Sequence, residues 1–559
     1  TGADTSRMTG TCVPMRGRML GLMMPAPMVL SNLISYAGDY HGATEVIGRR
    51  CDGSVERSNW AEMHRRSKRL ASALRSLDLP DVCRVASLAW NTLFHLEVYY
   101  GVLGLGLPLH TLNPRLTAAD LHYMIDLVND TVCFVDRANL AMAAELAPLV
   151  PRIRTWIFLD EGRGAPDAGI DNMIVHGDLV RKGDASSFAW PEFDENRAAT
   201  ICFTSGTTGH PKGVVYSHRS ITLSSMNMAM ADMYGTQRRG EGVTALPMAA
   251  MFHANAWMMP FTAPMNGHRL VLPGRAMDAA SLVDLLEQEQ VTIAGAVPTV
   301  WQDIVIEMDR RGIDRLALHT ALVAGTTLPE HLFDALKDRG IEPCQTWGMT
   351  EVPGAARATP PPGAITLPDG DRRQLALNRQ GRVGLHALMR IVDDDGRALP
   401  HDGKSAGHLQ VRGPTVVARY LGEEESEARD WLDTGDIAVI HPDSTMQIVD
   451  RAKDVIKSGG EWISSPQLES AAMQHPAVAA AAAIGVAHPR WQERPLLFCV
   501  LCPGHDAGVV DAIRAEMGRH VAKWWLPDEI RFIDSLPLTA TGKVNKLALR
   551  TLHAQESER

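Results

Sequence analysis

The sequence lacks any run of about 18 consecutive apolar residues, the length that a membrane-spanning helix requires. It also lacks an excess of positive charge, because 55 lysines and arginines stand against 65 aspartates and glutamates, for a formal net charge of −10. These absences argue against a membrane span and give no reason to expect nucleic acid as a partner. The sequence contains no internal repeat and no low-complexity tract. Its 559 residues, 45% of them apolar, predict a globular protein of two or more domains.

Cysteine is scarce as well. The eight cysteines are scattered through apolar stretches, and Cys499 and Cys502 form the one C-x-x-C pattern. A redox pair or half of a zinc site would fit that spacing, but the apolar neighbours favour a buried strand without a second pair of ligands. We therefore expect reduced thiols, a cytoplasmic protein and no structural zinc.

The most informative segment is residues 204–213, a loop rich in glycine and hydroxyl groups that ends in Pro-Lys-Gly. It follows the apolar residues 198–203, which predict a buried strand. Glycines let the backbone approach an anion and expose N–H groups, while the hydroxyls and the lysine add donors and charge. The spacing differs from a Walker loop, G-x-x-x-x-G-K-[ST]. A mobile surface loop is the alternative to a polyphosphate-binding loop. The candidate phosphate-binding residues are Thr204, Ser205, Gly206, Thr207, Thr208, Gly209 and Lys212.

Hydrophobic periodicity predicts alternating helices and strands. Apolar residues recur at helical spacing over residues 61–77 and 278–288, and Pro298 begins a further helix. Strands are predicted at residues 85–90, 291–297 and 478–484, with another helix at 509–523. The alternation predicts parallel sheets with helices on both faces. Residues 19–30 are interpreted as the opening of the first helix, and the segments 160–171 and 360–371 as loops.

Residues 204–213 resemble the phosphate-binding signature of the adenylate-forming superfamily of acyl-CoA synthetases, peptide-synthetase adenylation domains and luciferases. Five more segments that resemble the family's motifs follow in the family's order, at residues 324–329, 345–351, 431–436, 450–460 and 537–543. Residues 19–23, 190–196, 252–257 and 523–527 resemble the bacterial medium- and long-chain fatty acyl-CoA synthetase branch. That branch includes ligases for methylthiopropionate-like acids and natural-product amide ligases such as coronafacate ligase.

The resemblance implies an α/β fold in two parts. Residues 1–450 would form a large N-terminal domain of parallel and mixed sheets flanked by helices, with a β-barrel-like part. Residues 451–559 would form a small, mobile α+β lid. The charged segment at residues 450–453 is also the likeliest boundary from the sequence itself. In the family, the residue at the position of Lys453 changes its backbone torsions as the lid rotates.

The resemblance also assigns roles at the nucleotide site. Thr350 would contact the α-phosphate, Glu351 would coordinate Mg²⁺, and the mobile Lys543 would reach the reacting oxygens. Trp347 would stack on adenine and Asp436 would accept the ribose hydroxyls. The remaining residues matched to the ATP site are Gly325, Thr326, Gly348, Met349, Ile448 and Arg451.

The second half-reaction and the acyl pocket are implied in the same way. Lys457 would face the site after the lid turns, and Ser458, Gly459 and Gly460 would line a narrow pantetheine tunnel. The candidate acyl-pocket residues are His253, Asn255, Trp257, Val297, Thr346 and Val352. The sequence departs from the branch at Thr326–Thr327 and at residues 352–356, so the acid is not necessarily a plain fatty acid.

The expected function is an ATP- and Mg²⁺-dependent carboxylic acid ligase that forms an acyl adenylate and passes the acyl group to coenzyme A. An amide ligase that uses an amine or amino acid as acceptor is the first alternative, and a non-catalytic nucleotide-binding module is the second. Intact Lys212, Glu351 and Lys543 argue against the module. The expected partners are small molecules, with a homodimer as a possible assembly.

Overall fold

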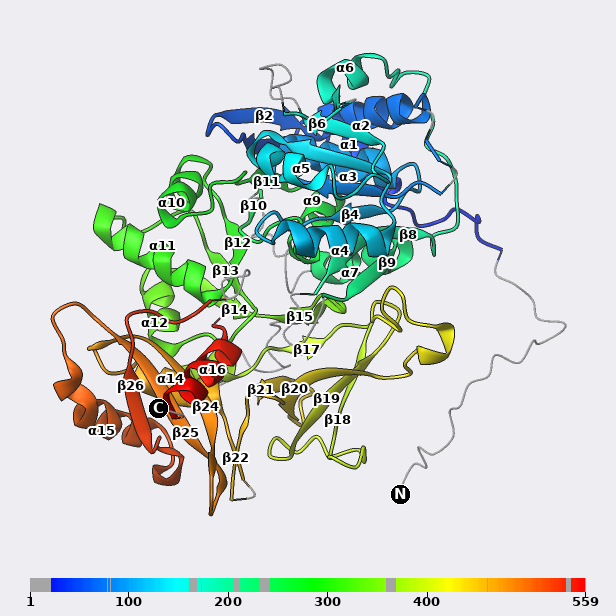
Figure 1. The fold of residues 1–559 in the computed structure, drawn as a ribbon. Helices are drawn as coiled ribbons and strands as arrows, with labels where there is room; N and C mark the ends of the chain where they lie inside the picture. The colour runs from blue at the N-terminus through cyan, green and yellow to red at the C-terminus, as the bar shows by residue number, and fades with distance from the viewer. Residues whose placement is uncertain are drawn as a thin grey trace.

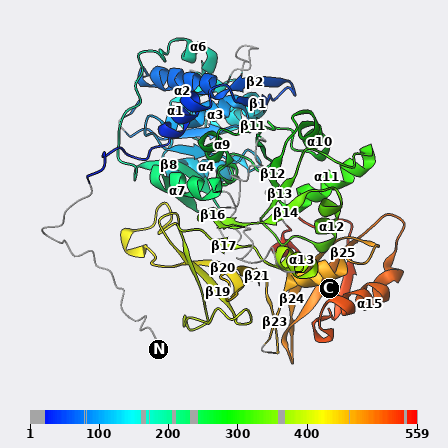
Figure 2. The ribbon, with the colours of Figure 1, turned by 180° about the vertical axis from the view of Figure 1, so that it is seen from behind.

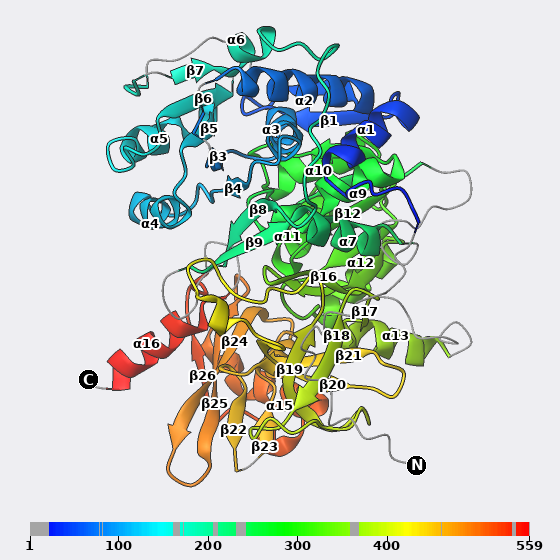
Figure 3. The ribbon, with the colours of Figure 1, turned by 90° about the vertical axis from the view of Figure 1, so that its right-hand side faces the viewer.

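The computed structural model describes residues 22–77, 79–80, 82–159, 168–171, 173–204, 211–230, 242–357, 368–459, 461–538 and 544–557. Within these ranges the elements form two large α/β layers, two smaller antiparallel sheets and a C-terminal α+β part (Figure 1). Figure 3 shows the two large α/β layers above, and the antiparallel strands beside the C-terminal part below.

One seven-stranded sheet is built mainly from the first part of the chain. Its order is β7-β6-β5-β3-β4-β8-β9, and every neighbouring pair is parallel except β8 with β9. Its strands are β3 (Val85–Leu88), β4 (Leu109–Thr111), β5 (Val132–Asp136), β6 (Thr155–Leu159), β7 (Met173–Val175), β8 (Ala198–Phe203) and β9 (Gly213–Ser217). The helices of this region are α2 (Trp60–Arg75), α3 (Leu93–Leu103), α4 (Ala118–Val128), α5 (Leu140–Leu146), α6 (His176–Arg181) and α7 (His218–Ala229).

The other seven-stranded sheet has the order β14-β13-β12-β10-β11-β1-β2, and only β1 with β2 is antiparallel. Its strands are β1 (Glu45–Arg49), β2 (Val55–Asn59), β10 (Thr244–Pro247), β11 (Arg269–Leu272), β12 (Ile293–Ala296), β13 (Thr320–Val323) and β14 (Glu342–Gln345). The helices of this region are α1 (Ser31–Tyr40), α8 (Ala254–Trp257), α9 (Met259–Asn266), α10 (Ala279–Gln288), α11 (Pro298–Arg311), α12 (Glu330–Asp338) and α13 (Asp369–Asn378).

The two large sheets repeat one topology. In each, five successive parallel strands take the order fifth, fourth, third, first, second, and the second strand then pairs with a further parallel strand. The sequence shows no internal repeat, so this symmetry belongs to the strand connections and not to the residues. The largest core lies between the sheets, where helices such as α2, α3 and α9 pack against both. Separate cores cover the outer faces, under α10–α12 on one sheet and under α4–α5 on the other.

Antiparallel strands follow the second sheet and form the part drawn in yellow in Figures 1 and 2. Their bounds are β15 (Trp347–Met349), β16 (Val352–Arg357), β17 (Arg382–Val383), β18 (Leu388–Val392), β19 (Ala406–Arg412), β20 (Leu432–Ile440) and β21 (Met446–Arg451). They make a three-stranded sheet, β15-β16-β17, and a four-stranded sheet, β18-β19-β20-β21. One core joins the two sheets and includes Trp347 and Val352.

The C-terminal part has a sheet and cores of its own. Its elements are β22 (Ile456–Ser458), β23 (Glu461–Ile463), α14 (Ser465–Ala472), β24 (Val478–His488), β25 (Gln492–Leu501), α15 (Val510–His520), β26 (Glu529–Phe532) and α16 (Lys546–Ser557). Its sheet has the order β23-β22-β25-β24, and β26 pairs with β25. Its two clusters of buried residues contain no member before Ile456, so this part does not share the cores of the large sheets.

The structure confirms the predicted α/β class and most predicted elements. Helix α2 begins after Asn59, whose side chain accepts a hydrogen bond from the Glu62 backbone N–H (2.8 Å). Helix α11 begins at Pro298 and ends at Gly312, where φ is 68°. In the described residues, no helix combines the length and the apolar character needed to cross a membrane.

Two local predictions are wrong. Residues 22–30 do not open the first helix, because α1 begins only at Ser31. Pro25 and Pro27 lack the N–H that a helix interior requires and keep the preceding residues extended. The loop predicted at residues 360–371 is interrupted at its end, because α13 already begins at Asp369 after Pro368.

We predict that Trp301→Ala lowers the free energy of unfolding by about 3–5 kcal/mol, because it empties a large site in the core and leaves a carbonyl unpaired. Trp301 is fully buried on α11, and its indole N–H donates to the Leu322 carbonyl of β13 (3.1 Å). Urea unfolding followed by circular dichroism measures the loss. Trp524→Ala is the control, because Trp524 is 46% exposed; equal unfolding midpoints for the two variants would contradict the prediction.

Candidate active site

The predicted site residues gather where parallel strands end. Thr204 follows β8, Val297 follows β12, Gly325 lies just after β13, and Thr346 follows β14. In open α/β sheets, ligands bind in the crevice outside these carboxyl ends. Segments up to 150 residues apart in the chain are therefore brought to neighbouring positions.

The two ends of the predicted phosphate loop are joined. The Thr204 backbone N–H donates to the Lys212 carbonyl (3.0 Å), and the Lys212 N–H donates to the Thr204 hydroxyl (3.2 Å). Beyond them, β8 and β9 continue as an antiparallel pair. Ser205, Gly206, Thr207, Thr208 and Gly209 lie outside the described residues.

Tyr420 connects Lys212 with Glu351. The Lys212 ammonium lies 4.8 Å from the centroid of the Tyr420 ring, and the Tyr420 hydroxyl donates to Glu351 Oε1 (2.8 Å). Burial and the neighbouring Glu351 carboxylate raise the pKa of Tyr420 above its usual value, so the hydroxyl keeps its proton. Beside Glu351, the Thr350 carbonyl accepts a hydrogen bond from the hydroxyl of Tyr216 on β9.

Glu351 fits a divalent metal that is bound mainly by phosphate. Its side chain is largely buried, and among the described residues no cation lies within ion-pair distance of its carboxylate. The described ranges contain no cluster of three histidine, cysteine or acidic side chains that could hold a metal alone. A single carboxylate completed by phosphate and water oxygens is a donor set typical of Mg²⁺.

Asp436, Trp347 and Arg451 form a second cluster. The Trp347 indole N–H donates to Asp436 Oδ2 (2.9 Å), and Arg451 Nε pairs with Asp436 Oδ1 (3.0 Å). Asp436 and Arg451 are direct partners in the antiparallel pairing of β20 and β21. Trp347 is 8% exposed, so in this structure its ring is a core side chain that holds the carboxylate.

The other predicted nucleotide residues surround these clusters. Gly325 has a φ of 95°, a conformation that favours glycine, and Thr326 after it is exposed. On β15, just before the turn that contains Glu351, Gly348 is exposed and Met349 is half-buried. The Ile448 backbone N–H donates to Gln380 Oε1 (2.7 Å), which ties β21 to the segment just before β17.

The acyl-pocket segment contains an unusual turn. Five successive residues without a glycine, Ala254 to Met258, have φ between 44° and 65°. Such left-handed backbone costs about 1–2 kcal/mol per residue. Asn255 anchors it, because its Nδ2 donates to Thr200 Oγ1 (3.0 Å) and its Oδ1 accepts from the Tyr99 hydroxyl (3.3 Å).

The turn presents Trp257 to the end of β12, where a Cβ added to Gly295 would lie 3.1 Å from the Trp257 ring. His253, Trp257, Val297 and Thr346 are half-buried, as a pocket lining requires. Val352 is different, because it is fully buried in the core around Trp347. Of the six candidates, Val352 and Asn255 therefore have their side chains inside the protein.

The predicted hinge residue Lys453 lies two residues after Arg451 of the second cluster, whereas Lys457 and Ser458 lie on β22. The Lys453 carbonyl accepts from Arg550 Nη2 (3.1 Å), and burial lowers the pKa of the Lys453 ammonium. The hairpin β22–β23 lies beside the β18–β19 hairpin, with the His408 and Trp462 rings 6.3 Å apart. The Lys457 backbone N–H donates to Glu493 Oε2 (2.8 Å), and Arg494 Nη1 donates to the Ser458 hydroxyl (3.3 Å), so both residues are bonded to β25 of the C-terminal part.

Gly459 is more constrained than the sequence indicates. Its φ is 62°, and an added Cβ would lie 2.9 Å from the Trp491 ring. A larger residue at position 459 therefore strains the hairpin whether or not a ligand passes it. Gly460 and Lys543 lie outside the described residues, although Leu538 and Val544, on either side of the Lys543 segment, form an isolated antiparallel bridge.

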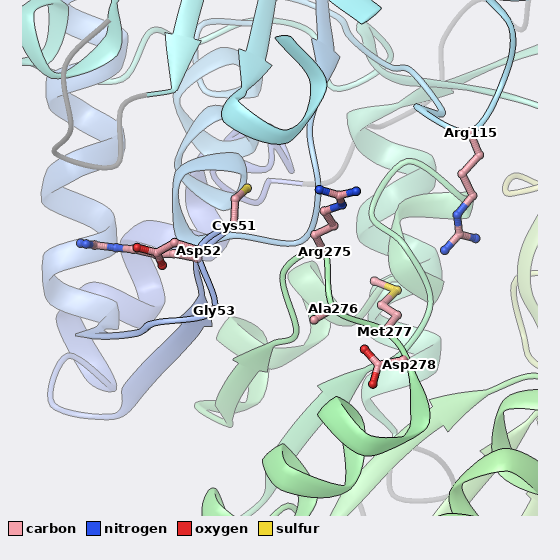
Figure 4. A pocket seen from close by; sticks show the side chains of 9 residues that line it. Cys51, Asp52, Gly53, Arg115, Arg275, Ala276, Met277 and Asp278 are labelled. Atoms are coloured by element: carbon pink, nitrogen blue, oxygen red, sulfur yellow. The ribbon is translucent and has the colours of Figure 1, made fainter. Parts of the chain in front are cut away.

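A separate open cleft of about 630 Å³ lies at the carboxyl ends of β1, β4 and β11 (Figure 4). Arg115 and Arg275 extend toward the same opening from the loops after β4 and β11. Arg115 lies over the Trp90 ring, 5.3 Å from its centroid. Arg50, also in the lining, is paired with Glu56 (3.0 Å).

Comparison with known proteins identifies the family. The profile of the AMP-binding enzymes matches residues 36–421, and that of the AMP-binding enzyme C-terminal domain matches residues 467–543. The chain belongs to the AMP-binding enzyme family. The resemblance inferred from the motifs is confirmed.

Several relatives of this AMP-binding enzyme match over nearly their full length. The 3-methylmercaptopropionyl-CoA ligase of Ruegeria lacuscaerulensis is 40% identical over 542 residues, covering 95% of this chain and 98% of the relative. The medium-chain-fatty-acid–CoA ligase of Ectopseudomonas oleovorans is 40% identical over 538 residues, covering 95% and 97%. An anthranilate CoA ligase in complex with anthranoyl-AMP superposes with a TM-score of 0.82 at 21% identity, covering 96% and 99%. This likeness confirms the fold.

Tyr420, Arg115 and Arg275 were not found by sequence reasoning. Tyr420 lies 69 residues from Glu351 in the chain, and the two arginines come from different sheets. No local pattern marks any of the three, because their significance arises from tertiary contacts.

We predict that Trp347→Phe weakens AMP binding about tenfold, because it removes a hydrogen bond to a charged group while keeping an aromatic ring. Calorimetric titration with AMP measures the change. Trp431→Phe is the control, because the Trp431 ring packs under Arg390, whose guanidinium lies 4.3 Å from the ring centroid. AMP binding equal to wild type in Trp347→Phe would show that the indole N–H does not orient Asp436 for the nucleotide.

Proposed function

We propose that this AMP-binding enzyme activates a carboxylic acid with ATP as an acyl adenylate, releasing pyrophosphate, and then transfers the acyl group to the thiol of coenzyme A. Two clusters of side chains carry the proposal, Lys212–Tyr420–Glu351 and Trp347–Asp436–Arg451. Both include residues from segments that follow parallel strands. The names of the relatives support a short- or medium-chain acid and coenzyme A as acceptor.

Adenylation requires that two anions approach each other and that charge at phosphorus be stabilised. Lys212 and the N–H groups of the Thr204–Gly209 loop would bind the outer phosphates, and Thr350 the α-phosphate. Asp436 would accept the ribose hydroxyls, held in place by Trp347 and Arg451. Glu351 would hold Mg²⁺, which neutralises phosphate charge when bound. Lys543 would stabilise the reacting oxygens.

The acceptor step uses the C-terminal part. We infer a domain boundary between residues 450 and 451, with Lys453 as the hinge, and the separate cores of the C-terminal part support independent movement. Rotation would exchange Lys543 for Lys457 at the site and bring Ser458, Gly459 and Gly460 to the pantetheine. The cytoplasmic location stays a prediction.

The cleft in Figure 4 would receive the nucleotide end of coenzyme A. Arg115 and Arg275 offer two guanidinium groups that suit phosphate oxygens, and no carboxylate of the described residues lies within ion-pair distance of Arg275. The Trp90 ring beneath Arg115 adds an aromatic wall. The cleft also lies at strand ends, as the acyl segment does.

The first test separates the half-reactions. Lys543→Ala should lower pyrophosphate exchange about a thousandfold, the effect of losing one preorganised charge at a developing anion. Lys457→Ala should keep that exchange and lower thioester formation from preformed acyl-AMP about a hundredfold. Lys523→Ala, an exposed lysine of the same part, is the control. If Lys457→Ala loses both half-reactions equally, the assigned exchange of lysines is wrong.

The second test concerns the cleft. Arg275→Ala should raise the KM for coenzyme A about tenfold, with the KM for ATP unchanged, because one phosphate contact is lost. The difference in the KM for coenzyme A between wild type and the variant should become smaller at high salt, because salt screens exposed charges. Arg181→Ala removes a surface arginine that is 74% exposed and serves as control. An unchanged KM for coenzyme A in Arg275→Ala would show that the cleft does not bind coenzyme A.

A further inference from the structure

We propose that Tyr420 is a positioning residue that keeps Lys212 and Glu351 apart and correctly oriented, so that the lysine binds phosphate and the carboxylate binds the metal. The inference rests on the proposed function, because it takes the roles of Lys212 and Glu351 from it. It adds a residue that no motif of the sequence marks.

The segment around Tyr420 already links the two motifs through its backbone. The Val417 N–H donates to the Glu351 carbonyl (2.9 Å), and the Leu421 N–H donates to the Gly213 carbonyl (2.8 Å). Gly213 is the residue after Lys212, and its backbone lies so close to Leu421 that an added Cβ would be 3.1 Å from Leu421 Cβ. Residues 417–421 therefore form a strap between the phosphate loop and the metal carboxylate.

The side chain of Tyr420 repeats this link at the functional atoms. Its ring contacts the Lys212 ammonium and its hydroxyl donates to Glu351 Oε1 (2.8 Å). This hydrogen bond fixes the orientation of the carboxylate whose oxygens would bind the metal. Lys212 and the buried Glu351 carboxylate both contact the Tyr420 side chain. If the ring were absent, the two opposite charges would form an ion pair, and neither would be available to its ligand.

Tyr420 is itself held firmly. Its backbone N–H donates to Glu423 Oε2 (2.7 Å), and Glu423 accepts two further hydrogen bonds from Arg429 (both 2.8 Å). The Arg429 guanidinium lies 5.2 Å from the Tyr420 ring centroid. A side chain anchored on its own segment in this way is suited to orient others.

The test measures metal binding and not turnover. Binding of Mn²⁺, used in place of Mg²⁺, is followed by electron paramagnetic resonance in the presence of a non-hydrolysable ATP analogue. Tyr420→Phe keeps the ring and removes the hydroxyl, so the Mn²⁺ dissociation constant should rise about tenfold while metal-free binding of the analogue stays unchanged. Tyr420→Leu removes both contacts and should also weaken binding of the ATP analogue.

Two controls make the outcomes distinguishable. Tyr100→Phe removes another tyrosine hydroxyl bond, to the Pro260 carbonyl (2.7 Å), and should leave Mn²⁺ binding unchanged. Glu351→Gln should weaken Mn²⁺ binding strongly. If Glu351→Gln does so and Tyr420→Phe binds Mn²⁺ like wild type, the positioning role is wrong and the proposed function stands. If Glu351→Gln also binds Mn²⁺ normally, the assignment of Glu351 fails and the inference fails with it.

Discussion

The carboxyl ends of parallel strands all face one edge of a sheet, and this constraint decides where the reacting groups of the enzyme lie. Two sheets of the same strand order each supply such an edge. The predicted phosphate loop leaves β8 of one sheet, while the predicted adenine and acyl segments leave β12, β13 and β14 of the other. The fold thus brings segments that are far apart in the chain to the ends of parallel strands.

The antiparallel strands position their site residues through strand pairing and core packing. Pairing of β20 with β21 places Asp436 opposite Arg451, and the core between β15 and β20 brings the Trp347 indole to the same carboxylate. Asp436 is thus buried, yet it is hydrogen-bonded and ion-paired, as a buried charge requires. A carboxylate that is oriented in this way before a ligand arrives would lose little entropy on accepting the ribose hydroxyls that we propose as its partners.

Local signals in the sequence predict much of the fold. Apolar spacing at residues 61–77 predicts α2, Pro298 marks the start of α11, and the apolar run at residues 198–203 predicts β8 with its observed bounds. The sequence does not reveal features that depend on residues in other elements of the fold. The left-handed turn at Ala254–Met258 contains no glycine, and it is stabilised by Asn255 through Thr200 and Tyr99, which lie in other elements. The role of Gly459 was predicted from ligand access, whereas the structure adds Trp491 and a positive φ.

The central claim is that this fold joins an activated carboxylic acid to coenzyme A. The most direct measurement incubates the full chain with ATP, Mg²⁺ and each of a panel of short- and medium-chain acids. Coenzyme A or a mixture of amino acids is added in separate reactions, and the products are identified by mass. The account predicts AMP, pyrophosphate and an acyl-CoA for at least one acid of the panel. Amides with amino acids and no thioester from any adenylated acid would contradict coenzyme A as the acceptor, and release of ADP would contradict adenylation itself.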